Sequence, residues 1–173
     1  MNNKQIIGQL KQIYELEKFQ INYYTSQISS TQNSLLDKAL SKIIQTDKEH
    51  TDFFVHIFTD ENIEIPKIAT TIADIAGSII GESMELTGQA NTFKIGVSLE
   101  EKALSAYYEL LKENDLESKL KDKLIDFKLD KEFHMLWLQH YAQYLKHRSS
   151  QKNYLLYEGI EEHPTVNLNM RWI

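Results

Sequence analysis

Apolar residues recur at alternating spacings of three and four over four long segments of the chain. This spacing places the apolar side chains on one face of an α-helix, so it predicts amphipathic helices that bury that face. The predicted helices span residues 4–30, 33–58, 90–113 and 117–147. The pattern therefore predicts an all-α protein built from long helices.

Two of the predicted connections are short and one is long. The polar stretches "SSTQN" and "ENDLES" join the first two and the last two helices, so each pair is expected to form an antiparallel αα-hairpin. Residues 59 to about 89 form the long connection, and its apolar stretch "IATTIADIAGSIIG" predicts a short extra helix. The predicted fold is a four-helix bundle of two αα-hairpins with a long crossover.

The length of 173 residues is typical of one domain. We expect the bundle to occupy residues 1–150 and residues 151–173 to form a tail that packs on it. The apolar stretch of the crossover is too short to span a membrane, although it can contact a membrane surface or a lipophilic ligand. The N-terminus lacks the basic start and apolar run of a signal peptide, so we expect a cytoplasmic protein.

The composition of the chain excludes several kinds of partner and site. The net charge of −6 and the scattered Lys and Arg residues give no basic surface, so we expect no nucleic-acid partner. The chain has no Cys, which excludes disulfides, thiolate metal sites, iron–sulfur clusters and a Cys nucleophile. A metal site in this protein would therefore use oxygen and nitrogen ligands.

Ionisable residues interrupt each apolar seam near its middle. They are Glu17 in the first helix, Asp47 and His50 in the second, Glu100 in the third, and Lys131 and His134 in the fourth. Burying an unpaired carboxylate or ammonium is strongly unfavourable. Residues of this kind that converge in one layer must compensate one another or bind a cation.

A weak internal repeat relates the two predicted hairpins. In "LEKFQINYY" Glu17 precedes Tyr24 by seven residues, and in "LEEKALSAY" Glu100 precedes Tyr107 by seven. The second and fourth helices correspond through "TDKEHTDFF" and "DKEFHMLWL". We expect Tyr24 and Tyr107 to pack in the core with their hydroxyls on the carboxylates of the polar layer.

The spacing of these residues suits a metal site. A carboxylate and a His three residues later share a helix face, so both can reach one ion. A Glu from each of two helices and a carboxylate-x-x-His pair from each of the others is how some bundles hold two ions. One imidazole and several hard oxygens per ion suit Fe(II) or Mn(II). The candidate ligands are Glu17, Asp47, His50, Glu100 and His134.

These motifs resemble the ferritin-like superfamily, in particular its rubrerythrin and demethoxyubiquinone hydroxylase branches. "EKFQINYY" and "EEKALSAYY" are similar to its Glu helices, and "DKEH" and "DKEFHMLWL" to its Glu-x-x-His helices, over residues 4–147. The crossover "AGSIIGES" is similar to the apolar helix that helps the hydroxylase admit a quinone, but Ala106 stands where that branch usually has His. The resemblance implies a di-iron carboxylate oxidoreductase that activates O₂ or peroxide towards a small or lipophilic substrate. A monomer or homodimer is expected.

Lys131 departs from the family pattern, because it stands where the family has a metal-binding Glu. At Asp47 the family's Glu is shortened by one methylene, which retains a ligand. Three carboxylates and one ammonium carry a net charge of −2, which balances one divalent ion rather than two. Four interpretations remain: an ion pair that replaces one metal, Asp130 or Glu132 as a substitute ligand, carbamylation of Lys131, or a metal-free network tethered by Lys131.

Two functions follow from these interpretations. The first is an iron or manganese oxidoreductase with one or two ions per chain. The second is a metal-free bundle with a structural or binding role. An iron-storage shell is a third hypothesis, which nothing in a single sequence favours.

Overall fold

The computed structural model describes residues 4–28, 34–67, 89–113 and 115–151, and the structural statements below concern these residues. They contain no strand and form four helices: α1 (Lys4–Ile28), α2 (Ser34–Asp60), α4 (Gln89–Leu111) and α5 (Ser118–Gln151). Each helix lies within a few residues of its predicted range. The all-α, four-helix prediction is confirmed.

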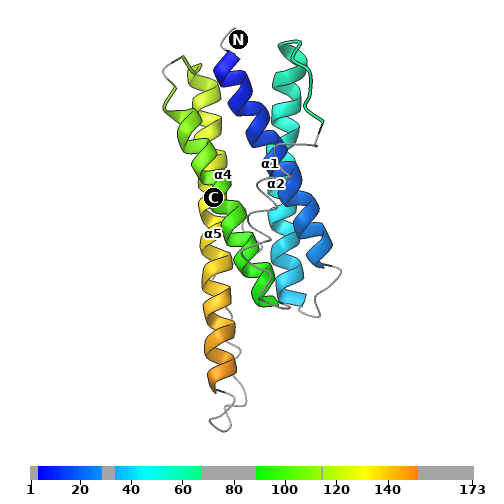
Figure 1. Ribbon diagram of the computed structural model, residues 1–173, viewed down its shortest axis with the longest axis vertical. Helices are drawn as coiled ribbons and strands as arrows, with labels where there is room; N and C mark the ends of the chain where they lie inside the picture. The colour runs from blue at the N-terminus through cyan, green and yellow to red at the C-terminus, as the bar shows by residue number, and fades with distance from the viewer. Residues whose placement is uncertain (1–3, 29–33, 68–88, 114, 152–173) are drawn as a thin grey trace.

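The four helices pack as two antiparallel hairpins, α1 with α2 and α4 with α5 (Figure 1). α1 also packs against α4, whereas α2 and α5 make the fewest contacts of the neighbouring helices. The end of α2 and the start of α4 lie at opposite ends of the bundle (Figure 1). The predicted crossover helix and the tail beyond Gln151 fall outside the described residues, so those two expectations stay predictions.

None of the described helices is long and apolar enough to cross a membrane.

The C-terminus of α2 is fixed by a Schellman motif. Asn62 adopts a left-handed conformation with φ of 54°, which Asn tolerates better than most residues. The amide of Asn62 donates to the carbonyl of Thr59 at 3.2 Å, and that of Ile63 donates to Phe58 at 2.7 Å. Ile63 packs against the apolar core beside the helix end. This cap carries α2 to Asp60, two residues beyond its predicted end.

The core consists of apolar clusters on either side of a polar layer. One cluster contains Leu10, Ile13, Phe54, Phe58, Tyr107, Leu110, Leu124 and Phe127, among others. Another contains Ile21, Tyr24, Leu36, Leu40, Ile43, Phe93, Trp137, Leu138 and Tyr141, among others. Most of the apolar residues predicted to face the core are buried, but Ile28, Ile57, Val97 and Leu111 are only partly buried. The bundle therefore encloses its polar layer between hydrophobic side chains.

Candidate metal centre

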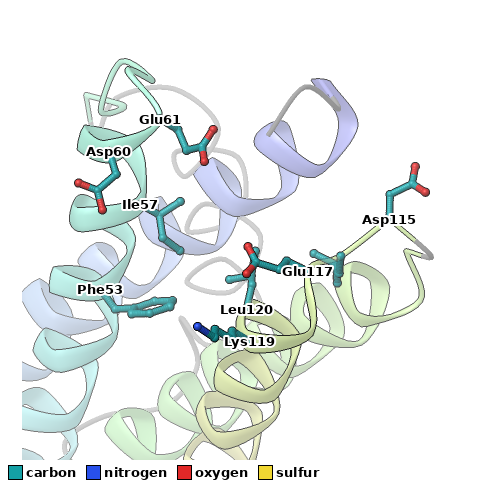
Figure 2. Close-up of a pocket in the computed structure, with 9 residues that line it drawn as sticks. Phe53, Ile57, Asp60, Glu61, Asp115, Glu117, Lys119 and Leu120 are labelled. Carbon is teal, nitrogen blue, oxygen red and sulfur yellow. The ribbon is translucent and has the colours of Figure 1, made fainter.

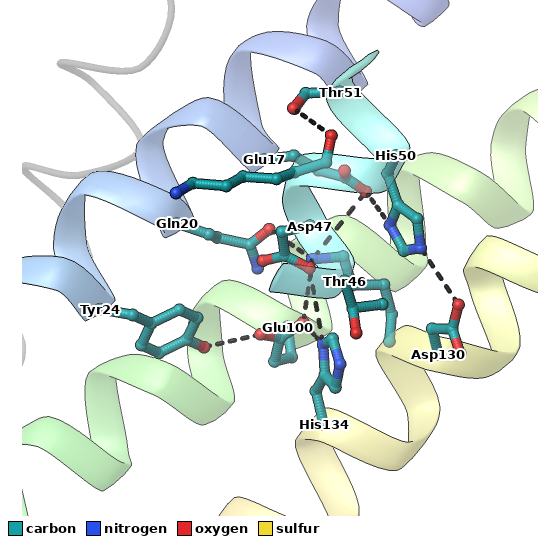
Figure 3. Close-up of polar contacts among 12 residues, drawn as sticks. Glu17, Gln20, Tyr24, Thr46, Asp47, His50, Thr51, Glu100, Asp130 and His134 are labelled. Carbon is teal, nitrogen blue, oxygen red and sulfur yellow. Dashed lines mark hydrogen bonds and ion pairs between the residues drawn. The ribbon is translucent and has the colours of Figure 1, made fainter. Parts of the chain in front are cut away.

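The six ionisable seam residues meet in one buried layer, to which every described helix contributes (Figure 3). They are Glu17, Asp47, His50, Glu100, Lys131 and His134, and none is more than 1% exposed. Helical spacing brings them together, because each lies at a seam position near the middle of its helix. Charges buried to this degree must be balanced within the layer.

Lys131 lies at the centre of the layer. Its Nζ donates to Asp47 Oδ1 at 2.5 Å, and it lies 3.6 Å from Glu100 Oε2 and 3.9 Å from Glu17 Oε1. Burial lowers the pKa of Lys131, but the three carboxylates outweigh burial and raise that pKa above its ordinary value. Lys131 is therefore an ammonium, which is a poor starting point for carbamylation.

Gln20 belongs to the layer, although the sequence analysis missed it. Its side chain is fully buried, and its Oε1 accepts a hydrogen bond from Lys131 Nζ at 3.0 Å. Gln20 follows Glu17 by three residues and so shares its helix face. This spacing could have indicated Gln20, but Gln is uncharged and only ionisable residues are conspicuous in an apolar seam.

His50 is held between two carboxylates. Its Nδ1 lies 3.2 Å from Glu17 Oε1, and its Nε2 lies 3.1 Å from Asp130 Oδ2. Burial lowers the pKa of His50, but Glu17 and Asp130 outweigh burial and raise it to about 9. In the layer without a metal, both ring nitrogens therefore carry protons at neutral pH and donate to the two carboxylates.

Neither proposed substitute ligand takes the place of residue 131 in the layer. Asp130 contacts His50 from the partly exposed edge of the layer, with a side chain 23% exposed. Glu132 pairs with Lys128 at 2.8 Å and accepts a hydrogen bond from Tyr108 at the surface. Asp130 therefore positions His50, and Glu132 lies on the outside of α5.

His134 lies beside Asp47 and Glu100. Its Nδ1 is 3.6 Å from Asp47 Oδ1 and 3.9 Å from Glu100 Oε2. Burial, helped by the positive charges of Lys131 and His50, lowers the pKa of His134 well below its ordinary value. Burial also raises the pKa of Asp47 to about 7 and raises the pKa of Glu100. His134 is thus a neutral imidazole beside two carboxylates whose negative charge the layer balances only in part.

Two buried tyrosines hold the two glutamates in a crosswise arrangement. Tyr24 of α1 donates to Glu100 Oε1 of α4 at 2.6 Å, and Tyr107 of α4 donates to Glu17 Oε1 of α1 at 2.5 Å. These contacts match the expectation that both hydroxyls lie on site carboxylates. The internal repeat of the sequence therefore corresponds to an approximate two-fold relation between α1 and α4.

Gly96 allows Tyr24 to reach Glu100. A Cβ at residue 96 would lie 3.1 Å from Leu138 Cδ1 and 3.4 Å from Tyr24 Cε1. We expect Gly96→Ala to lower the free energy of unfolding, because overpacking typically costs about 1–3 kcal/mol and helix propensity returns at most about 1 kcal/mol. Urea unfolding monitored by circular dichroism measures this change.

Gly8→Ala is the matched control for Gly96→Ala. Gly8 lies in α1, and a Cβ there would meet nothing within 4 Å. The control should stabilise the protein by up to about 1 kcal/mol through helix propensity alone. An equal stabilisation by both substitutions would contradict the close packing around Tyr24.

The ligand atoms form two groups that share Asp47. One group is Glu17, Asp47 and His50, and the other is Asp47, Glu100 and His134; within each, one atom per residue lies within 4.8 Å of the others. The pKa of the imidazole is raised in the first group and lowered in the second, so in the layer without a metal only His134 is neutral at pH 7. Two carboxylates and one imidazole form a donor set that suits Fe(II) or Mn(II).

Several carboxylate oxygens in the layer lack hydrogen bonds. Glu17 Oε2, Asp47 Oδ2 and Glu100 Oε2 are buried and accept none from the residues that the structure describes. A buried polar atom without a partner typically costs about 1–3 kcal/mol, and a charged one costs more. Buried carboxylate oxygens without hydrogen bonds are the kind of ligand that a bound cation would satisfy.

A pocket of about 350 Å³ opens between α2 and the start of α5 (Figure 2). The residues that line it are Phe53, Ile57, Asp60, Glu61, Asp115, Leu116, Glu117, Lys119 and Leu120. The ring of Phe53 contacts Phe127 at 5.3 Å between centroids, and Phe127 stacks on His50 at 3.9 Å. Two aromatic rings therefore separate this pocket from the edge of the polar layer.

Comparison of the chain with protein-family models, curated proteins and solved structures gives no match. The resemblance of the motifs to the ferritin-like superfamily therefore stays a prediction from the sequence.

Proposed function

We propose that this chain is a ferritin-like non-haem iron or manganese protein that binds one divalent ion through Asp47, Glu100 and His134. Its proposed activity is that of an oxidoreductase acting with O₂ or peroxide on a small, apolar substrate. The observation that carries the proposal is the pair of ligand groups sharing Asp47, in which each of the three carboxylates has one buried oxygen without a hydrogen bond. Lys131 takes the place of a second ion.

The charge balance of the layer supports one ion. Four carboxylates face two cations, which leaves a net charge of −2 when all six groups are ionised. The carboxylates are Glu17, Asp47, Glu100 and Asp130, and the cations are Lys131 and His50. A single divalent ion neutralises this excess, whereas two ions would leave the layer with an excess of positive charge.

The residues around the proposed ion have separate roles. A bound Fe or Mn ion would supply a redox couple. Asp47, Glu100 and His134 would hold the ion, and the hydroxyl of Tyr24 orients Glu100. Lys131 fixes Asp47 and keeps a second cation out of the layer. The apolar clusters on either side exclude bulk water.

Metal content tests the proposal directly. After anaerobic loading with Fe(II) or Mn(II) and desalting, mass spectrometry should find close to one ion per chain. His134→Gln should abolish binding because it removes the neutral imidazole, whereas His50→Gln should retain the ion. O₂ consumption by the Fe(II)-loaded protein should be lost in His134→Gln.

His140→Gln is the control for these substitutions, because His140 is exposed on α5. It should change neither metal content nor O₂ consumption. A well-folded wild-type protein that takes up no metal would refute the proposal.

The second candidate function is a metal-free bundle. It is favoured by Lys131, whose ammonium lies within 4 Å of all three seam carboxylates and compensates part of their charge. The two candidates differ in thermal stability. A ligand that binds only the folded state raises the melting temperature, so Mn(II) in excess over chelator should raise it for a metal protein and leave it unchanged for a metal-free one.

A further inference from the structure

The pocket between α2 and the start of α5 combines an apolar floor with a charged rim (Figure 2). The residues of the floor are half-buried or buried, and they are Phe53, Ile57, Leu116 and Leu120. The volume of about 350 Å³ lies at the lower end of the range typical of small-molecule sites, about 300–1,000 Å³. The pocket is therefore large enough for a small organic molecule, and its floor favours one with an apolar body.

The charges of the rim favour a cation. The rim residues are exposed, and they are Asp60, Glu61, Asp115, Glu117 and Lys119. Four carboxylates and one ammonium give the rim a net charge of −3 when all five groups are ionised. Figure 2 shows the side chains of Glu61 and Glu117 reaching from opposite sides toward the space between the end of α2 and the start of α5. Carboxylates on two sides can hold one ammonium through charge-assisted hydrogen bonds.

Aromatic rings beside the pocket are also suited to a cation. The ring of Phe53 extends from α2 toward Leu120 (Figure 2), and it meets Phe127 edge to face at 5.3 Å between centroids. Phe127 already accepts a cation, because Lys123 Nζ lies 5.1 Å from the centroid of its ring. An ammonium within about 6 Å of a ring centroid is attracted to the face of the ring. Phe53 therefore offers a ligand in the pocket both apolar contact and an attraction for positive charge.

We propose that this pocket binds a small organic cation with an apolar body, of the arylalkylammonium class. The apolar body packs on Phe53, Ile57 and Leu120, and the ammonium lies at the rim between Glu61 and Glu117. An inorganic cation would leave the apolar floor uncovered, whereas an anion would be repelled by the rim. The inference does not depend on the proposed metal, because none of the residues that line the pocket is a candidate metal ligand.

Titration of the full chain with benzylamine, followed by heteronuclear NMR, tests this proposal. Saturable shift changes are expected at the residues that line the pocket. Benzyl alcohol keeps the ring but lacks the charge, and methylamine keeps the ammonium but lacks the ring. Each of these two probes should bind at least about tenfold more weakly than benzylamine. Added salt should weaken the binding of benzylamine, because the charges of the rim are exposed.

The double variant Glu61→Gln/Glu117→Gln should lower the affinity for benzylamine at least about tenfold, because it removes both carboxylates that flank the ammonium. Glu15→Gln/Glu101→Gln is the matched control, since it removes the same charge outside the pocket; it should retain the wild-type affinity. Circular dichroism melting establishes that both variants are folded. The absence of saturable binding would overturn the proposal, and so would equal binding of benzyl alcohol and benzylamine, or equal affinities of the two double variants.

Discussion

Replacing Lys131 by methionine is expected to lower the free energy of unfolding of the metal-free protein by about 3–5 kcal/mol. The substitution keeps a long unbranched side chain but removes the ammonium that contacts Asp47, Glu100 and Glu17. The three carboxylates would then be buried with less positive charge to balance them, which raises the free energy of the folded state relative to the unfolded state. Urea unfolding in the presence of chelator measures the difference.

Lys128→Met provides the matched control. Lys128 lies on the same helix, less than one turn from Lys131, and pairs with Glu132 near the surface. Such pairs contribute only about 0–1 kcal/mol, so this substitution should change the free energy of unfolding little. Equal effects of the two substitutions would contradict the central position of Lys131 in the charge balance.

Replacing Lys131 by glutamate is expected to increase the metal content from the proposed one ion per chain to two. The substitution exchanges an ammonium for a carboxylate, so the layer gains two units of negative charge. A fourth seam carboxylate also places an acidic side chain between the two ligand groups that share Asp47. Inductively coupled plasma mass spectrometry after anaerobic Fe(II) loading and desalting gives the number of ions.

A control makes the same change of charge outside the layer, so that an effect on the site can be distinguished from an effect of net charge. Lys128→Glu alters the net charge of the protein equally but leaves the polar layer intact, so it should retain one ion per chain. If Lys131→Glu also bound a single ion, Lys131 could not be the residue that limits the number of ions. The metal-free Lys131→Glu protein should be markedly less stable than wild type and should regain stability as metal is added.

Much of the fold could be predicted from the sequence because amphipathic spacing depends only on which side chains leave water. The seams of α1 and α2 ran through Leu10, Ile13, Leu36 and Leu40, all of which are buried. Helix ends were less accurate. The end of α2 depends on the left-handed conformation of Asn62, which periodicity does not detect.

The membership of the polar layer was predictable in part. Ionisable residues at seam positions are unfavourable unless they meet, so their spacing alone indicated a common layer. The contact between His50 and Asp130 was not predictable, since it joins α2 to a residue on the edge of α5. The protonation of His50 depends on that contact and on the distance to Glu17, which only three-dimensional geometry provides.

The polar layer also determines how the four helices are aligned along their axes. If one helix slid by a single turn, about 5.4 Å, its charged residues would enter the apolar clusters on either side. Lys131 would lose Asp47 and Gln20 together, and the crosswise tyrosine bonds would break if α1 or α4 moved. An apolar layer would tolerate such a slide far better. The layer therefore fixes the register of the four helices, and it would favour a single alignment with or without a bound metal.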